Sequence, residues 1–160
     1  MTLRVRDLMT TDVVTLQPTD TIKTAAIKFA VDNISGAPVV DNRNHLLGIV
    51  SQNDILRTLL KYQDLLDKDN PEGLSILKHS LDSGEGGDRI VKAVDEISDL
   101  EISTIMTYST LTTSADAPIL DVLRAMINMD VNRVPVIEKG VLIGIISRGD
   151  ITFALYKRKA

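Results

Sequence analysis

The chain has 160 residues, of which 44% are hydrophobic and 25% are charged, with a formal net charge of −4. This is the composition of a globular chain with enough apolar side chains for a sizeable core. The mild negative charge gives a nucleic-acid partner little electrostatic support, and the absence of cysteine excludes disulfides, thiolate metal sites and cysteine nucleophiles.

The first predicted elements are a strand and a helix. Residues 13–16 form a short β-prone run that ends before Pro18. Thr19 or Asp20 then offers an N-cap, and apolar residues follow at helical spacing. We therefore expect a helix that closes near Asn33.

A hairpin and a second helix follow. Two apolar runs of strand length, residues 37–40 and 46–50, flank a polar tip at residues 41–45, which predicts a β-hairpin. Ser51 then begins a helix whose apolar side chains continue to Leu60.

Residues 61–101 predict two short helices. Leucines in the first part and isoleucines and valines in the second recur at helical spacing. The glycine-rich residues 83–87 separate them, and Asp88 is the expected N-cap of the second helix. The apolar faces of both helices must be covered by the rest of the chain, by each other or by another chain.

The second half of the chain repeats the first about 97 residues later. Residues 110–113 predict the strand, Pro118 stands early in the next helix, and residues 138–140 form a hairpin tip one residue shorter than its counterpart. A length change confined to a turn is typical of a structural repeat. The repeated strings are Leu8-Met9-Thr10 with Ile105-Met106-Thr107, Ala37-Pro38-Val39-Val40 with Val134-Pro135-Val136-Ile137, and Gly48-Ile49-Val50-Ser51-Gln52-Asn53-Asp54-Ile55 with Gly144-Ile145-Ile146-Ser147-Arg148-Gly149-Asp150-Ile151.

These strings resemble the cystathionine β-synthase (CBS) domain, and two copies in tandem resemble a stand-alone Bateman module. The resemblance implies a first CBS repeat over residues 1–60, a helical linker or insertion over 61–101, and a second CBS repeat over 102–160. The implied fold class is α/β (α+β), with two βαββα repeats packed sheet-to-sheet about a pseudo-twofold axis. Modules of this family commonly form homodimers and bind adenosine-containing ligands in clefts between the copies.

Each repeat carries a Ser-x-x-Asp string where a strand passes into a helix, at Ser51 and Asp54 and again at Ser147 and Asp150. One interpretation is structural, because the serine caps the helix and the carboxylate favours the positive end of its dipole. The other is functional, because a carboxylate beside a cleft can accept both hydroxyls of a ribose. The resemblance supports the second interpretation, since the matching aspartate holds the ribose in nucleotide-binding family members.

By resemblance, each ligand cleft contains residues from both repeats. The expected ligand-binding residues are Ser147, Asp150, Ile34 and Ser35 in one cleft, and Ser51, Asp54, Val131, Asn132 and Arg133 in the other. Arg133 occupies a position that often supplies a basic residue to phosphates, whereas the first repeat has Gly36 there. The alternative interpretation of Arg133 is a solvated loop residue, so the clefts are unequal only if Arg133 binds the ligand.

Two functions remain open. The first is a regulatory module that senses AMP, ADP, ATP or a related adenosyl compound as a regulatory ligand, with no required cofactor and an unknown protein target. The second is a dimeric protein-interaction platform that binds no nucleotide. Gly36 favours the second function because it removes a basic contact, and so does Asp20, because a carboxylate near a phosphate is repulsive.

We expect neither catalysis nor a metal site. No nucleophile and base can be assembled from the motifs, and His45 and His79 lack chelating spacing. The sequence begins without the apolar stretch of a signal peptide, and no apolar run approaches the roughly 20 residues of a transmembrane helix. We therefore expect a cytoplasmic protein that associates with neither membrane nor nucleic acid.

Overall fold

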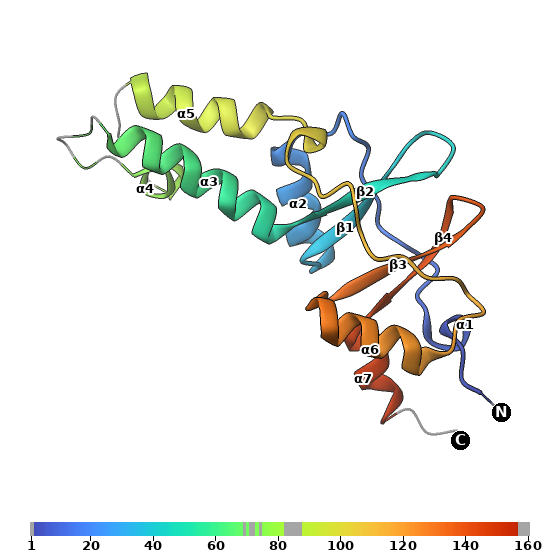
Figure 1. The fold of residues 1–160 in the computed structure, drawn as a ribbon. Coiled ribbons are helices and arrows are strands. Elements are labelled where there is room, and N and C mark those ends of the chain that lie inside the picture. Colours follow the sequence, from blue (N-terminus) through green and yellow to red (C-terminus); the bar gives the residue numbers. More distant parts are fainter. Residues whose placement is uncertain (1, 69, 71–72, 74, 82–87, 157–160) are drawn as a thin grey trace. The chain divides into compact units, whose positions relative to one another are not determined.

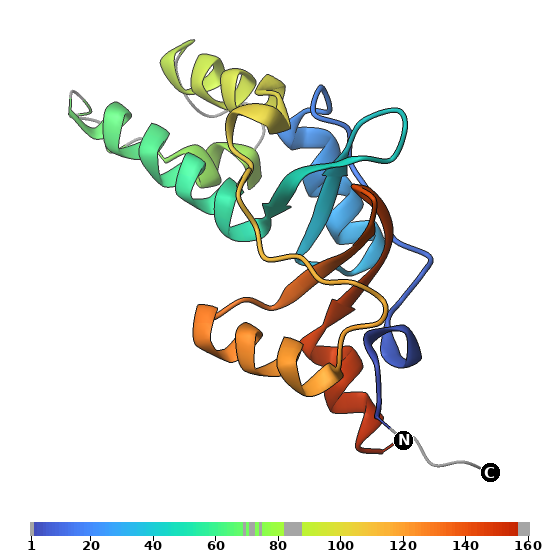
Figure 2. The same cartoon turned by 45° about the vertical axis from the view of Figure 1, so that its right-hand side comes forward.

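The computed structural model describes residues 2–68, 70, 73, 75–81 and 88–156. The chain divides into two compact units, neither of them continuous in sequence (Figures 1 and 2). Unit 1 comprises Met1–Thr15, Pro38–Gly48 and Thr107–Ala160, and unit 2 comprises Leu16–Ala37 and Ile49–Met106. The fold is a mixture of helices with two small antiparallel sheets, and this confirms the predicted fold class.

Unit 2 is mainly helical. Its helices are α2 (Ile22–Asp32), α3 (Gln52–Asp67), α4 (Ile76–Leu81), α5 (Asp88–Asp99) and the short 3-10 helix η1 (Ile102–Thr104). Helix α5 contacts α2, α3 and α4, and Figure 1 shows α3 and α5 side by side. Leu66 of α3, Ile90 and Ile97 are almost fully buried. The predicted helices of the insertion therefore pack against each other and against the first repeat's helices.

The boundaries of the insertion differ from the predicted ones. Helix α3 continues to Asp67, past the predicted end at Leu60, because Leu66 adds a buried residue to its apolar face. Asp88, the expected N-cap, is the first residue of α5. The glycine-rich residues 83–87 and the side chain of His79 lie outside the described part of the chain.

Thr21 is the N-cap of α2. Its hydroxyl accepts the backbone N–H of Thr24 at 3.2 Å. The predicted caps Thr19 and Asp20 were wrong, because the Asp20 carboxylate instead accepts the N–H of Gln17 at 2.7 Å. The predicted end of the helix is confirmed, since Asn33 is its C-cap with a left-handed φ of 53°.

Unit 1 contains a hairpin covered by helices. The elements are α1 (Val5–Leu8), α6 (Ile119–Met129), β3 (Arg133–Glu138), β4 (Val141–Ser147) and α7 (Arg148–Ala154). Lys139 and Gly140 join β3 to β4 with φ values of 51° and 81°, the conformation that two-residue hairpin turns favour. The buried core of this unit consists of Val5, Ile119, Val122, Met126, Val134, Val136 and Ile146.

The first hairpin consists of β1 (Gly36–Val40) and β2 (Leu46–Ser51). Its tip belongs to unit 1, where the Leu142 N–H donates to the Asn44 carbonyl at 2.9 Å and the Leu46 N–H to the Gly140 carbonyl at 3.1 Å. The tips of the two hairpins therefore bind each other within one compact unit.

The strand predicted at the start of each repeat is much shorter than expected. Thr113 pairs in parallel with Val136, and its N–H donates to the Pro135 carbonyl at 3.0 Å. Pro135 has no N–H with which to continue this ladder, so the pairing is brief. Among the described residues, neither 13–16 nor 110–113 forms a named strand.

None of the described helices combines the length and the apolar content that a bilayer crossing requires.

Candidate functional site

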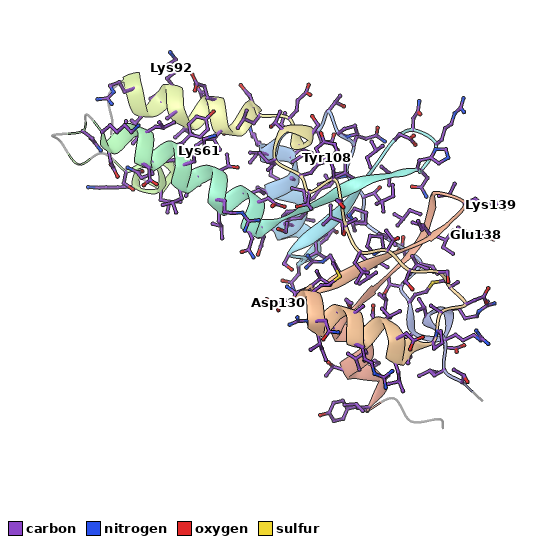
Figure 3. The ribbon with its side chains drawn as sticks, in the orientation of Figure 1. Lys61, Lys92, Tyr108, Asp130, Glu138 and Lys139 are labelled. Atoms are coloured by element: carbon purple, nitrogen blue, oxygen red, sulfur yellow. The ribbon has the colours of Figure 1, made fainter. Side chains whose placement is uncertain are left out.

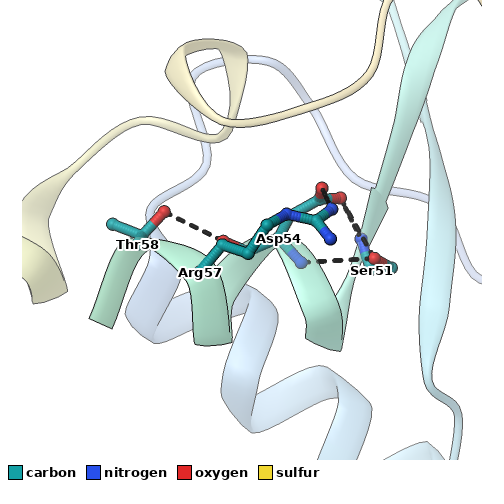
Figure 4. Close-up of polar contacts among 4 residues, drawn as sticks. All are labelled: Ser51, Asp54, Arg57 and Thr58. Atoms are coloured by element: carbon teal, nitrogen blue, oxygen red, sulfur yellow. Dashed lines mark hydrogen bonds and ion pairs between the residues drawn. The ribbon is translucent and has the colours of Figure 1, made fainter. Parts of the chain in front are cut away.

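Ser51 and Asp54 form a closed capping box at the start of α3 (Figure 4). The Ser51 N–H donates to Asp54 Oδ2 at 2.8 Å, and the Asp54 N–H donates to Ser51 Oγ at 3.3 Å. Asp54 is 8% exposed, the one charged side chain among the described residues that is buried. The carboxylate is therefore fixed in place before any ligand is present.

Arg57 binds the second oxygen of the Asp54 carboxylate. Its Nη2 donates to Asp54 Oδ1 at 2.8 Å, while 70% of the Arg57 side chain remains exposed. Each carboxylate oxygen has two acceptor positions. Ser51 uses both positions of Oδ2 through its N–H and its hydroxyl, so one position remains, on Oδ1 beside Arg57. The exposed guanidinium likewise keeps donors available for an anion in solvent.

The second repeat builds the same box at the start of α7. The Ser147 N–H donates to Asp150 Oδ2 at 2.9 Å, and the Asp150 N–H donates to Ser147 Oγ at 3.1 Å. The outer oxygen, Asp150 Oδ1, accepts the Thr10 hydroxyl at 3.2 Å in place of an arginine. The structural interpretation of both Ser-x-x-Asp strings is thus confirmed, and the two carboxylates have unlike neighbours.

One backbone bond in each repeat ties the segment before the hairpin to the following helix. The Gln52 N–H donates to the Ser35 carbonyl at 2.9 Å, and the Arg148 N–H donates to the Asn132 carbonyl at 3.0 Å. These equivalent bonds place each pre-hairpin segment beside its own repeat's capping box.

The structure accordingly groups the predicted site residues by repeat. Unit 2 brings together Ile34, Ser35, Ser51 and Asp54, and unit 1 brings together Val131, Asn132, Arg133, Ser147 and Asp150. The combination of residues across repeats that the resemblance implies stays a prediction.

Arg133 is the first residue of β3 and pairs with Ser147 across the hairpin. It is half-buried, and this burial lowers the pKa of its guanidinium below the ordinary value. Its interpretation as a solvated loop residue is therefore wrong. The matching Gly36 is the first residue of β1 and supplies no side chain.

Arg148 is a residue of the site region that the sequence analysis missed. Its Nε donates to the Val131 carbonyl at 3.2 Å, and its Nη2 contacts Asp130 Oδ1 at 3.0 Å. The side chain thus fixes the segment that carries Val131. Its place immediately after Ser147, at the first position of a helix, was the available signal.

A hollow of about 360 Å³ opens beside Asp54 within unit 2. Helix α3 contributes Asp54, Arg57, Thr58, Lys61 and Tyr62, and the opposite wall is Leu100, Thr104 and Ile105. The α3 residues follow one another at helical spacing, so they form a single face of the helix. Arg57 and Lys61 were not among the predicted site residues, although their spacing from Asp54 is readable in the chain.

A second hollow of about 670 Å³ lies along α5 and shares Tyr62 and Leu100 with the first. Figure 3 shows the labelled Lys61 and Lys92 on α3 and α5, respectively. The remaining residues that line this hollow are Val91, Lys92, Asp95, Glu96 and Asp99. Carboxylates outnumber cations here, whereas cations outnumber carboxylates in the hollow beside Asp54.

The model of the CBS domain family matches this chain twice, over residues 5–61 and 101–157. A protein of Methanocaldococcus jannaschii is 28% identical over 152 residues, which cover 94% of this chain and 90% of that protein. Some relatives are longer, and the chain spans only 40% of a second protein from the same organism.

Solved structures share the fold. The structure of CBSX2 in complex with AMP has a TM-score of 0.69 and 23% identity, and the alignment covers 96% of each chain. The CBS domain pair of protein MJ0100, in complex with 5′-methylthioadenosine and S-adenosyl-L-methionine, has a TM-score of 0.66 and 22% identity over 98% of this chain and all of that one.

Proposed function

The chain belongs to the CBS domain family, and from this membership we propose that it is a regulatory protein that binds an adenosyl-containing small molecule in clefts between its two repeats. Structural neighbours with the same fold bind AMP, or 5′-methylthioadenosine and S-adenosyl-L-methionine. For this chain we propose AMP, ADP, ATP or a relative as a regulatory ligand, in a cytoplasmic protein without catalytic activity.

The pair of preorganised carboxylates carries this proposal. Asp54 and Asp150 are each fixed by a serine at a helix start, and each keeps acceptor capacity on the oxygen that faces away from the cap. In the proposed complex a hydroxyl of the ribose donates to that oxygen. The backbone groups and apolar side chains of Ile34 and Val131 receive the adenine ring.

Regulation requires that ligand binding be linked to a conformational change of the protein. A ligand shifts a conformational equilibrium only by its difference in affinity between two states. We propose a homodimer whose subunits or repeats change arrangement on binding. In this scheme α4 and α5, which lie outside the repeats, present the surface that contacts an unknown protein target. A monomer by light scattering at micromolar concentration would contradict the dimer.

The second candidate is a dimeric protein-interaction platform that binds no nucleotide. Gly36 still favours it, because it offers no basic side chain to a phosphate. Asp20 no longer favours it, since the neutral hydroxyl of Thr21 caps α2 and the Asp20 carboxylate accepts the N–H of Gln17.

Ligand-dependent thermal stability separates the two candidates. The purified protein is heated with AMP, ADP, ATP, S-adenosylmethionine or NADH, because a ligand at about 100 times its Kd adds about 2.7 kcal/mol to the free energy of unfolding. We expect a rise in Tm with at least one compound. No shift with any of them at millimolar concentration would reject the sensor and leave the platform.

A further inference from the structure

We propose that Arg57 and Lys61 form a phosphate subsite beside Asp54, which makes this chain selective for adenosyl ligands that carry phosphates over neutral or cationic ones. This inference rests on the proposed function, because it takes Asp54 as the residue that binds the ribose. It goes further by naming the chemical class of the ligand and the residues that select it.

The geometry comes from a single face of α3. Arg57 lies one turn after Asp54, and Lys61 lies two turns after it, about 10 Å along the helix axis. Both line the 360 Å³ hollow, and Asp54 lines it too. A ribose held at Asp54 can thus direct its phosphates along a row of cations, first to Arg57 and then to Lys61.

Both cations are available to an anion. The Arg57 side chain is 70% exposed and uses one nitrogen on Asp54 Oδ1, so the rest of its planar fork can receive phosphate oxygens. Lys61 is exposed and has no ion pair with any described residue. Asp54 is the one carboxylate among the residues that line this hollow, and the other charged lining residues are the cations Arg57 and Lys61.

The hollow along α5, where carboxylates outnumber cations, limits how far the row of Arg57 and Lys61 extends. Past Tyr62, which lines both hollows, the charged groups are one cation, Lys92, and three carboxylates, those of Asp95, Glu96 and Asp99. Their carboxylates repel phosphate, so the cationic row ends at Lys61. A monophosphate reaches Arg57 alone, whereas a di- or triphosphate reaches both cations.

The subsite predicts a selectivity order. ATP and ADP bind more tightly than AMP, and AMP binds more tightly than adenosine, because each added contact is charge-assisted. S-adenosylmethionine is disfavoured, because its sulfonium would stand near two cations. The other repeat has Thr10 beside its aspartate where the first has Arg57, so its site lacks the Arg57 contact.

The test is calorimetric titration of the full chain with adenosine, AMP, ATP, S-adenosylmethionine and inorganic pyrophosphate. Arg57→Gln should weaken AMP and ATP by about tenfold or more and leave adenosine within about threefold. Lys61→Gln should weaken ATP by a similar factor and leave AMP unchanged. Arg57→Lys keeps the charge without the fork and should recover part of the loss.

The matched control is Arg124→Gln. Arg124 pairs with Asp121 at the same three-residue spacing, at 3.6 Å, and its side chain is 71% exposed, but it lies on α6 in unit 1. This variant removes the same charge and should bind every ligand as the wild type does. Circular dichroism and the Tm without ligand verify that each variant is folded.

Three outcomes would overturn the subsite. Equal weakening of adenosine and ATP by Arg57→Gln would mean that Arg57 only positions Asp54. Unchanged ATP binding in both variants would place the phosphates elsewhere, and pyrophosphate binding as tight as that of ATP would mark a site for free anions. Failure of the wild type to bind any adenosyl compound rejects the proposed function itself, and is distinct from these results.

Discussion

The Asp54 carboxylate accepts both the backbone N–H and the hydroxyl of Ser51, at 2.8 and 3.1 Å, although Asp54 is almost fully buried. The same carboxylate therefore serves the fold and, in the proposed function, the ligand. A variant that removes it changes stability and binding together, so the two effects have to be measured separately.

Asp54→Ala should lower the free energy of unfolding by about 1–3 kcal/mol in the absence of ligand, because it removes the carboxylate of the capping box and leaves the half-buried Ser51 N–H without its acceptor. Asp150→Ala should cost less, because Asp150 is only half-buried and has no arginine partner. Urea denaturation measures both. Asp54→Asn keeps an acceptor for the Ser51 N–H and is the preferred variant for ligand titrations. Equal losses in the two alanine variants would contradict the role given to burial.

Gly144 is expected to tolerate no side chain. A Cβ built on it would lie 2.9 Å from Met9 Sδ and 3.0 Å from the Thr10 carbonyl oxygen, and this oxygen cannot move without disturbing the hydrogen bond that it accepts from the Ile145 N–H. Gly144→Ala should therefore destabilise the chain by about 1–3 kcal/mol, as overpacking does.

Gly149→Ala is the control for Gly144→Ala. Gly149 lies in α7, and its added Cβ would meet Ser147 Oγ at an ordinary 3.6 Å. Alanine has the higher helix propensity, so this variant should be neutral or more stable by up to about 1 kcal/mol. Chemical denaturation of both variants tests the difference, and similar values for the two would refute the close approach at Gly144.

Asp41 makes the stability depend on acid pH. The N–H groups of His45 and Arg43 donate to its Oδ1 at 2.9 and 2.8 Å, and the bond from His45 is the main cause that lowers the pKa of Asp41 below the ordinary 3.8. A lowered pKa gives stability that is complete above the unfolded-state value and is lost as the pH falls through the folded-state value.

The wild type should therefore lose its advantage over Asp41→Asn as the pH falls from about 5 to about 3. Urea midpoints measured for both proteins across this range test the prediction. Because the Asp41 side chain is partly exposed, we expect a small effect. A constant difference at every pH would show that the tip bonds do not favour the ionised carboxylate.

Local sequence determined much of this protein. The Ser-x-x-Asp strings predicted both capping boxes, because a serine and a carboxylate three residues apart satisfy the free N–H groups of a helix start by themselves. The hairpins and the helix end at Asn33 were predicted for the same reason, since turn and cap conformations depend on the few residues that form them. The repeat then identified the family that the comparisons confirm.

Other features depended on contacts between distant residues. The strand expected at residues 110–113 is short because it meets Pro135, and the tip of the first hairpin belongs to the unit that contains β4 because Asn44 bonds to Leu142. No periodicity in the chain encodes these partners.

In the candidate site, too, some features follow from local sequence and others from tertiary contacts. Sequence alone determined the two aspartates and their serines, because their chemistry is local to a helix start. Tertiary structure decided that Arg57 holds Asp54, and that the wall formed by Leu100, Thr104 and Ile105 turns one face of α3 into a hollow lined by cations. A hollow needs two walls, and its second wall lies about forty residues further along the chain, where only packing can bring it to α3.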